Sequence, residues 1–269
     1  MDRRTLLAAG AAALLPPVTK RLDKIGVQLY TVRREMARDV EATLARVAEI
    51  GFREVEFAGY FDRSPEQLRR TLTGLGLAAP GAHYPFESLR DGWDRILDAA
   101  ARIGHRWAIV AWIPREARES LDGWHRVAEA FNHAGEQARA AGLAFAYHNH
   151  SYEFAPLEGR IPFDVLLAET DPRVVAIEMD VYWITLGGHD PRAYFARHPG
   201  RFPLVHVKDS AGPPEHRMVD VGRGTMDWKG IFALSRQAGI RHYLVEHDEP
   251  GDAFASIAAG YQYLRRLRF

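Results

Sequence analysis

Residues 142–150 read Gly-Leu-Ala-Phe-Ala-Tyr-His-Asn-His, and this short run contains the pattern on which the fold prediction rests. A long amphipathic segment, residues 121–141, precedes Gly142, and glycine commonly ends a helix. The apolar run 143–148 that follows has the length and composition of a buried strand. Two histidines, His148 and His150, stand where this strand ends. The pattern is therefore a helix, a stop signal, a strand and a polar strand end.

The same order of elements repeats along the chain from residue 25 onward. Gly51, Gly76 and Gly239 each lie between a helix-like segment and a strand-like one. Alternating strands and helices predict a parallel sheet, and eight such units in about 250 residues predict a closed barrel. We therefore predict one α/β domain, a single (β/α)8 TIM barrel, with no linker or second domain. The predicted strands are residues 25–30, 54–57, 78–84, 107–112, 143–148, 174–180, 204–208 and 243–247.

The composition excludes several classes of protein. The chain has 269 residues with 47% hydrophobic and 26% charged side chains, the proportions of an ordinary globular protein. The absence of cysteine excludes disulfides, thiolate metal sites and cysteine nucleophiles. The 35 basic and 35 acidic residues balance, so the chain lacks the net positive charge that is typical of nucleic-acid-binding proteins. We expect no nucleic-acid partner.

The N-terminus differs in composition from the rest of the chain. Arg3 and Arg4 precede a weakly apolar run, residues 8–15, which Pro16 and Pro17 close. This layout resembles a twin-arginine export signal, and it predicts a signal over residues 1–20, a catalytic barrel over residues 21–269 and a periplasmic location. The alternative is an alanine-rich N-terminal helix on a cytoplasmic protein. The apolar run is too short to cross a membrane, so we predict no membrane span.

Polar side chains gather at the ends of the last four predicted strands. The carboxyl ends of barrel strands carry the catalytic groups of such folds, so these side chains are expected to meet. Any one of them could simply bond a neighbouring loop, but the joint pattern of carboxylates and imidazoles indicates a divalent-metal site. We expect Mn²⁺ first, with Mg²⁺, Co²⁺ or Zn²⁺ as alternatives. The residues are His148, His150, Glu153, Glu178, Asp180, His206, Lys208, Glu246 and Asp248.

Seven local strings carry a resemblance to a known family. Over residues 25–269 the sequence resembles the xylose-isomerase-like TIM-barrel superfamily, in the branch of sugar phosphate isomerases/epimerases. The resemblance implies an enzyme with a small-molecule carbohydrate substrate. Barrels of this kind often pair, so a homodimer is also considered. The strings are IGVQLYTVR (25–33), GFREVEFAGY (51–60), LAFAYHNHSYEF (143–154), EMDVYWITLGGHDP (178–191), LVHVKD (204–209), VGRGTMDWKGIF (221–232) and LVEHDEP (244–250).

The resemblance implies four metal ligands, in the order Glu, Asp, His, Glu, from the last four strands. At the first place, alignment on Gly142 puts His148 where relatives have a carboxylate, and the nearest carboxylate is Glu153. We expect Glu153 to be the first ligand, and the alternative is that His148 takes its place. His148 and His150 are then candidates for proton transfer or for holding substrate hydroxyls. The other three places match Asp180, His206 and Glu246.

The chemistry that the resemblance implies is removal of a proton next to a carbonyl group. A divalent metal that chelates the carbonyl and a neighbouring hydroxyl stabilises the enediolate that forms. Glu246 is expected to take the proton, and Glu153 or a histidine to return it. Return of the proton to the other carbon or to the opposite face makes the protein a sugar isomerase or epimerase. Lys208 is expected to pair with an anionic substrate group, or else to form a salt bridge with Glu178 or Asp209.

Three other functions remain open. A leaving group on the next carbon would turn the same chemistry into elimination, and a 3-keto-glycoside lyase/hydratase is the first alternative. An AP-endonuclease-like phosphodiesterase would need further ligands in the first half of the barrel, which offers only Glu56 and His83. A non-catalytic sugar-binding barrel would need pocket aromatics alone. The aromatic candidates for contact with a sugar ring are Trp112, Tyr147, Tyr182 and Trp183.

The segment VGRGTMDW, residues 221–228, has two interpretations. Gly222 and Gly224 would permit a phosphate cradle at the start of a helix. Alternatively, Asp227 is the N-cap of that helix and Trp228 anchors it in the core. If the chain is exported, phosphorylated sugars are poor candidates, and neutral sugars, keto-sugars or glycosides become the expected substrates.

Overall fold

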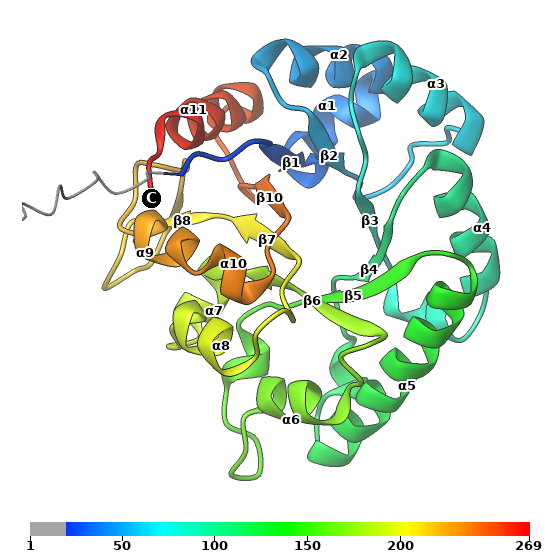
Figure 1. Cartoon of the computed structure of the whole chain (residues 1–269), viewed down its shortest axis with the longest axis vertical. Coiled ribbons are helices and arrows are strands. Elements are labelled where there is room, and N and C mark those ends of the chain that lie inside the picture. Colours follow the sequence, from blue (N-terminus) through cyan, green and yellow to red (C-terminus); the bar gives the residue numbers. More distant parts are fainter. Residues whose placement is uncertain (1–19) are drawn as a thin grey trace, which may run out of the picture.

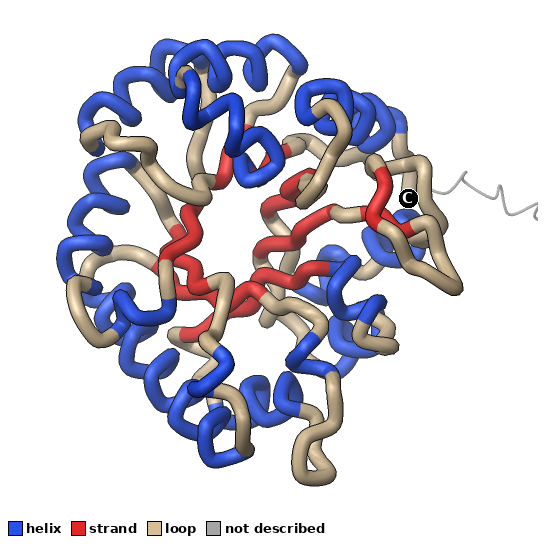
Figure 2. The backbone as a smooth tube through the Cα atoms, turned by 180° about the vertical axis from the view of Figure 1, so that it is seen from behind, coloured by secondary structure: helices blue, strands red, loops and turns tan. Residues whose placement is uncertain are grey.

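Eight parallel strands form a nearly closed barrel with helices around it, as Figures 1 and 2 show from opposite sides. The structure, a computed structural model, describes residues 20–269, so the predicted export signal falls almost wholly outside the described residues. The strand order is β2-β1-β10-β7-β6-β5-β4-β3. Two isolated parallel bridges, Glu54 to Ala78 and Phe57 to Ala82, join β2 to the segment of β3 and complete the ring. The predicted TIM barrel is confirmed.

The elements follow one another as the repeating unit predicts. The barrel strands are β1 (Gly26–Gln28), β2 (Glu54–Glu56), β3 (Gly81–Tyr84), β4 (Trp107–Val110), β5 (Ala144–His148), β6 (Val175–Asp180), β7 (Leu204–Val207) and β10 (His242–Val245). The helices are α1 (Arg33–Arg38), α2 (Val40–Ile50), α3 (Pro65–Leu75), α4 (Trp93–Ile103), α5 (Leu121–Ala140), α6 (Pro162–Glu169), α7 (Val181–Leu186), α8 (Pro191–Arg197), α9 (Trp228–Ala233), α10 (Ser235–Ala238) and α11 (Ala253–Arg266). Short 3-10 turns are η1 (Leu29–Val32), η2 (Phe86–Leu89), η3 (Arg115–Ala117) and η4 (Tyr152–Phe154).

Each of the eight predicted strands is present, and each is shorter than predicted. The strand-like runs extended into the loops at the carboxyl ends, so Tyr30 lies in η1 and Trp112 lies beyond β4. A small antiparallel pair that the sequence pattern did not predict, β8 (Asp209–Ser210) with β9 (Met218–Val219), follows β7. This hairpin stands beside the carboxyl end of the barrel.

Local signals fix where the helices begin and end. At α3, the Ser64 side chain and the Gln67 side chain form a reciprocal capping box, and Gly76 ends the helix in a left-handed conformation. At α5, Gly135 is required by packing, because a Cβ atom there would lie 2.5 Å from the carbonyl oxygen of Val174. Among the described residues, no helix is both long enough and apolar enough to cross a membrane.

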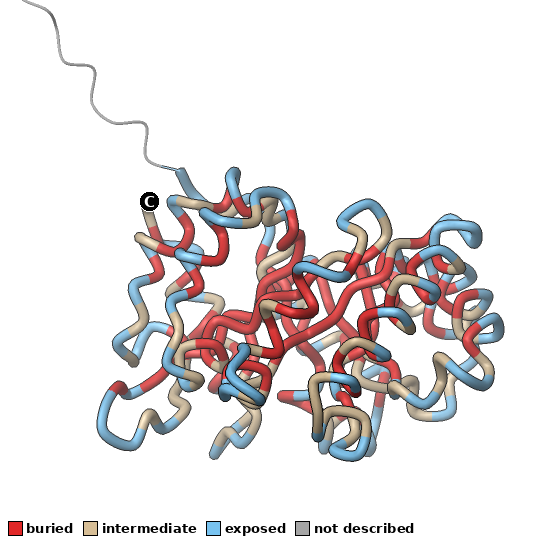
Figure 3. Tube along the Cα trace, turned by 90° about the horizontal axis from the view of Figure 1, so that it is seen from below, coloured by how far each residue is buried: buried red, intermediate tan, exposed pale blue. Residues whose placement is uncertain are grey.

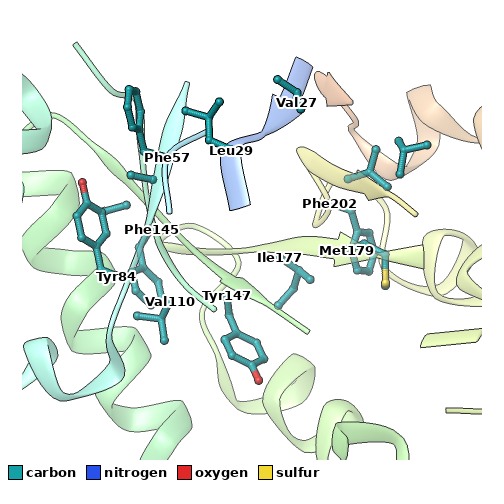
Figure 4. Close-up of a cluster of buried hydrophobic side chains, with 14 of the residues drawn as sticks. Val27, Leu29, Phe57, Tyr84, Val110, Phe145, Tyr147, Ile177, Met179 and Phe202 are labelled. Carbon is teal, nitrogen blue, oxygen red and sulfur yellow. The ribbon is translucent and has the colours of Figure 1, made fainter. Parts of the chain in front are cut away.

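The core has an outer and an inner part. Between the strands and the helices lies a continuous apolar cluster, part of which Figure 4 shows, including Phe145, Tyr147 and Met179. Figure 3 shows that buried backbone runs through the centre of the molecule and that the exposed segments lie around it. A second, smaller cluster comprises Trp107, Ile109, Ala146, Leu204 and Leu244.

Alternation along the strands then makes the barrel interior polar toward the carboxyl ends. Because every second residue of a strand shares a face, the residues two positions beyond the small apolar cluster point the same way. Ala146, Leu204 and Leu244 are followed in this manner by His148, His206 and Glu246, and all three of the latter are buried. The apolar cluster therefore underlies a layer of charged and imidazole side chains.

Candidate active site

Three imidazoles converge on one carboxylate oxygen at the carboxyl ends of the strands. The Oε2 atom of Glu178 lies 2.8 Å from His83 Nε2, 3.1 Å from His148 Nδ1 and 3.2 Å from His206 Nε2. We call these four residues the Glu178 cluster. Glu178 itself is fully buried, and its Oε1 atom has no hydrogen-bond partner among the described residues. An unpaired buried carboxylate oxygen is costly, so the cluster has capacity for a further positive group.

A second cluster surrounds Lys208, whose side chain is 2% exposed. The ammonium group lies 3.0 Å from Asp180 Oδ2, 3.0 Å from Glu246 Oε2 and 2.9 Å from Asp248 Oδ1. We call these four residues the Lys208 cluster. The salt bridges predicted for Lys208 were to Glu178 or Asp209, and that prediction was wrong in its partners, because the alternation along β10 and its extension brings residues 246 and 248 to the lysine instead.

His206 joins the two clusters. Its Nδ1 atom lies 2.6 Å from Glu246 Oε2, and its Nε2 atom lies 2.9 Å from Glu56 Oε1. Ligand atoms of Asp180, His206 and Glu246 all lie within 4.8 Å of one another, close enough to hold one metal ion. The ligand atoms of the Glu178 cluster meet the same condition. The site thus offers two overlapping sets of oxygen and imidazole donors.

The buried charges shift one another's protonation. Burial would lower the pKa of His83, but Glu56 and Glu178 beside it raise that pKa to about 9. Burial lowers the pKa of His148 well below its usual range, and the neighbouring His206 adds to the effect. His148 is therefore a neutral imidazole, and the cationic groups of the site are its neighbours.

Two carboxyl groups of the Lys208 cluster, those of Asp180 and Glu246, also differ in the direction of their pKa shifts. Burial raises the pKa of Asp180 to about 6, against the lowering influence of Lys208. The pKa of Glu246 lies below its usual range, because the charges of Lys208 and His206 outweigh the effect of burial. The Glu246 carboxylate therefore stays ionised, and Asp180 is the one of the two that takes up a proton more readily.

Asp180 also fixes the start of α7. Its Oδ1 atom accepts hydrogen bonds from the backbone N–H groups of Tyr182 and Trp183, both at 3.0 Å. Asn149, which directly follows β5, accepts a hydrogen bond from the Asp180 backbone N–H at 3.0 Å. The Oδ2 atom of Asp180 is therefore the one that remains for Lys208 or a cation.

The structure does not bring Glu153 to the other predicted metal ligands. Its Oε1 atom accepts hydrogen bonds from the Tyr147 hydroxyl at 2.5 Å and from the His150 backbone N–H at 2.8 Å. Burial raises the pKa of Glu153 to about 7, although both hydrogen bonds lower it. In this position Glu153 orders the loop that carries His150, and His148 occupies the place beside Asp180, with 3.7 Å between His148 Nε2 and Asp180 Oδ2.

His150 lies at the edge of the site among aromatic rings. Its ring centre is 5.0 Å from that of His148, and its ring is stacked on Tyr152 at 5.7 Å. Trp112, 52% exposed, packs edge-on against it at 5.2 Å, and Trp183 lies 5.6 Å away. The buried Nδ1 atom of His150 has no hydrogen-bond partner among the described residues. The mouth of the barrel thus has an aromatic wall next to the charged clusters.

Of the other two aromatic candidates, Tyr147 is buried in the core and donates to Glu153, and Tyr182 donates to the backbone carbonyl of His216.

Gln28, Glu56 and His83, from the first half of the barrel, complete the site. The sequence pattern did not predict them as residues of this site. His83 lies 3.0 Å from Glu56 Oε1, and Gln28 donates to the same oxygen at 2.6 Å. All three end, or nearly end, predicted strands, at residues 25–30, 54–57 and 78–84. Strand-end position together with period-two alternation would have found them, because these rules apply equally to both halves of a closed ring.

A pocket of about 760 Å³ opens beside the Lys208 cluster. Its walls come from Trp183 of α7, from the β9 region between Arg217 and Asp220 with Arg223 beyond it, and from His247, Asp248, Glu249 and Gly251, which follow β10. Asp248, a member of the Lys208 cluster, lies in its lining. The pocket thus adjoins the charged centre through Asp248, and the other three members of the Lys208 cluster are not part of its lining.

The loop at residues 221–228 does not present its backbone to an outside phosphate. The Asp209 carboxylate, which is buried, accepts hydrogen bonds from the N–H groups of Gly222, Gly224 and Met226 and from the Trp228 indole. Asp227 caps α9 by accepting from Gly230, and Trp228 is 1% exposed. The loop is thus built around an internal carboxylate, as the cap-and-anchor interpretation requires.

We expect Asp209→Ala to lower the free energy of unfolding by about 2–3 kcal/mol. The change leaves the buried Trp228 indole N–H and the part-buried backbone N–H groups of Gly222 and Met226 without their acceptor, and unsatisfied buried donors are costly. Asp227→Ala on the same loop removes an exposed cap and should cost about 1 kcal/mol. Urea unfolding followed by circular dichroism measures both. Equal losses in the two variants would contradict the central position of Asp209.

The fold and the site together define a class of protein: an α/β barrel with oxygen and imidazole donors gathered at the carboxyl ends of its strands. The family model described as xylose isomerase-like TIM barrel matches residues 44–267. The chain belongs to this family, and it is an enzyme.

The relatives divide between two activities. An inosose dehydratase from Lacticaseibacillus casei is 23% identical over 260 residues, covering 82% of this chain and 87% of that protein. One from Geobacillus thermodenitrificans is 22% identical and covers 80% and 84%. A solved sugar phosphate isomerase/epimerase from Parabacteroides distasonis has a TM-score of 0.80 at 28% identity, covering 91% and 98%. The zinc-containing IOLI protein, at 11% identity and a TM-score of 0.71, shares the fold.

Proposed function

We propose that this protein is a divalent-metal-dependent dehydratase or lyase that acts on a keto-sugar by elimination next to the carbonyl group. The observation that carries the proposal is the meeting of Asp180, His206 and Glu246, close enough to hold one metal ion, in a chain with inosose dehydratases of several bacteria among its sequence relatives. These names favour elimination, the alternative of the sequence prediction, over isomerisation or epimerisation.

The donor set fits a divalent cation. Carboxylate oxygen and imidazole nitrogen suit Mn²⁺, Co²⁺ and Zn²⁺, and the buried Oδ2 atom of Asp180 accepts no hydrogen bond from the described residues. We propose Asp180, His206 and Glu246 as ligands with His148 at the fourth place, rather than Glu153, and Mn²⁺ as the preferred ion. A bound divalent ion would polarise the substrate carbonyl and acidify the neighbouring C–H bond.

The residues of the chain then move the protons. Glu246, held ionised by Lys208 and His206, would take the proton from the carbon next to the carbonyl. The hydroxyl or alkoxyl group on the following carbon leaves with its bonding electrons and takes a proton, so that water or an alcohol is released and a conjugated C=C bond forms. His150, whose Nδ1 atom has no hydrogen-bond partner among the described residues and whose pKa burial lowers to about 3, would hold the leaving group as a neutral imidazole, and the proton on that group would come from solvent. Lys208 keeps the carboxylates of its cluster in place.

A second candidate is a sugar isomerase or epimerase, in which the proton returns to the substrate and nothing leaves. The observation that favours it is the solved isomerase/epimerase structure, which is 28% identical and covers nearly the whole barrel. Both candidates begin with the same proton removal, and they differ in the fate of the neighbouring carbon–oxygen bond.

The test is a screen of keto-inositols, ketoses, aldoses and 3-keto-glycosides in deuterated water with added Mn²⁺ or Co²⁺, followed by NMR. We expect deuterium uptake next to a carbonyl together with a rise in ultraviolet absorbance from the conjugated product. Deuterium uptake with a rearranged sugar and no loss of water or alcohol would select the second candidate. Metal-stripped protein is the control, and the absence of exchange with every compound would contradict both candidates.

A further inference from the structure

Each histidine that we propose as a metal ligand has its second nitrogen on a buried carboxylate. His148 faces Asp180 with Nε2 and has Nδ1 3.1 Å from Glu178 Oε2. His206 faces Glu246 with Nδ1 and has Nε2 2.9 Å from Glu56 Oε1. Glu178 and Glu56 therefore stand behind the two rings, on the side away from Asp180 and Glu246.

These contacts select a tautomer for His148. A neutral imidazole carries one N–H group, and an ionised carboxylate can only accept, so Glu178 places that proton on Nδ1. The lone pair of Nε2 then faces Asp180 Oδ2 across 3.7 Å, with an acceptor on each side of the gap. A cation in this gap would satisfy both atoms. The Glu178 contact thus prepares His148 to bind a metal through Nε2.

His83 ties the two carboxylates to each other. Its Nε2 atom lies 3.0 Å from Glu56 Oε1 and 2.8 Å from Glu178 Oε2, and Gln28 donates to Glu56 from the neighbouring strand. Glu56, Glu178 and Gln28 are fully buried, so water does not compete for these contacts. The first three strands of the barrel thus support the rings of His148 and His206 from behind.

We propose that Glu56, His83 and Glu178 form an outer layer that orients His148 and His206 and strengthens the binding of a divalent cation. Glu56 and Glu178 are positioning residues, because they act through the histidines and do not themselves hold the ion. The proposal rests on the metal site of the proposed function, and it assigns to the first half of the barrel a part in that site. Partners of this kind hold a ligand ring in one tautomer and one orientation.

Metal affinity of Glu178→Gln and Glu56→Gln is the direct test. Protein stripped with a chelator is titrated with Co²⁺, and binding is followed by the visible spectrum of the ion and by calorimetry. We expect each variant to bind Co²⁺ about 10- to 100-fold more weakly than the parent. The matched control is Glu54→Gln, which removes another buried carboxylate of β2 that pairs with a histidine, His242, toward the other end of the strand. The control should bind like the parent, and equal affinity of all four proteins would overturn the proposal.

The tautomers give a readout that needs no variant and does not depend on how a variant folds. In parent protein loaded with Zn²⁺, ¹⁵N NMR of the histidine rings should show protons on His148 Nδ1 and His206 Nε2. The opposite tautomers would make Glu178 a ligand of the metal itself and would overturn its positioning role.

Failure of this inference and failure of the proposed function give different results. A parent protein that eliminates water from a keto-sugar with Mn²⁺, beside variants of undiminished Co²⁺ affinity, would refute the outer layer alone. A parent that binds Co²⁺ through the expected nitrogens but leaves every keto-sugar unchanged would refute the proposed function alone.

Discussion

Asp180→Asn is expected to abolish most metal binding and catalysis while the barrel stays folded. The Oδ1 atom of Asp180 caps α7 through two backbone N–H groups, and asparagine is as good an N-cap residue as aspartate. The Oδ2 atom faces His148 and Lys208, and an amide nitrogen there cannot bind a cation. The substitution therefore separates the metal site from the helix start.

We expect the divalent-metal affinity of Asp180→Asn to fall by more than the roughly 100-fold that loss of an outer partner costs. Turnover of the parent's substrate should fall by about 100- to 1000-fold, the loss that corresponds to several kcal/mol of transition-state stabilisation. Metal content of the purified protein and the rate of deuterium uptake measure the two effects. Asp190→Asn, which alters the N-cap of α8 at an exposed position, is the control. A variant with the parent's metal content would contradict the proposed ligand.

Lys208→Met is expected to destabilise the metal-free protein by about 3–5 kcal/mol at pH 8. The lysine is 2% exposed and is the cation shared by Asp180, Glu246 and Asp248, so its removal leaves buried carboxylates without their partner. Urea unfolding measures the loss. Lys229→Met, at an exposed position of α9, should change the free energy of unfolding by less than about 0.5 kcal/mol.

The defect of Lys208→Met should depend on pH with a definite sign. Although burial would raise the pKa of Glu246, Lys208 and His206 hold it below the unfolded value of 4.5. A carboxyl group with a lowered folded-state pKa contributes stability above its unfolded pKa and loses that contribution as the pH falls. The difference between parent and variant should thus be largest well above pH 4.5 and shrink in acid. A defect that stays constant below pH 4.5, down to the lowest pH at which the parent remains folded, would show that lost packing, and not lost charge, is its cause.

Added Mn²⁺ should recover more stability in Lys208→Met than in the parent. The ammonium group lies 3.0 Å from both Asp180 Oδ2 and Glu246 Oε2, which are two of the proposed metal-ligand atoms. Removal of the lysine leaves these atoms to the metal alone, and an ion that binds only the folded state stabilises it. A smaller gain in the variant than in the parent would place the metal elsewhere, in the Glu178 cluster.

Local sequence signals were sufficient for the barrel and for part of its site. Gly142 and the run 143–148 predicted a strand that is present at Ala144–His148, and the same signals located the other seven strands. Period-two alternation also predicted that His206 and Lys208 share a face, as they do. These features follow from short-range rules, because a strand's direction and its alternation depend only on neighbouring residues.

The same signals did not predict which of several possible partners a polar side chain contacts. The sequence contains Glu153 next to the expected ligand position, but nothing in the local pattern shows that the Tyr147 hydroxyl and the His150 N–H take its carboxylate. Lys208 was expected to meet Glu178 or Asp209, and it meets three other carboxylates. Such choices depend on rotamers and on which strands become neighbours.

By itself the sequence determined a barrel of alternating helices and strands, with Asp180, His206 and Glu246 aimed into its carboxyl end. Only the tertiary structure decided that Glu56 and His83, from the first half of the barrel, contact His206 and Glu178 from the second half. Glu56 is 150 positions from His206 in the chain, yet their side chains are 2.9 Å apart. The physical reason is ring closure. In the strand order β2-β1-β10-β7, two strands separate β2 from β7, and no periodicity within a strand encodes which strand will face it across the barrel.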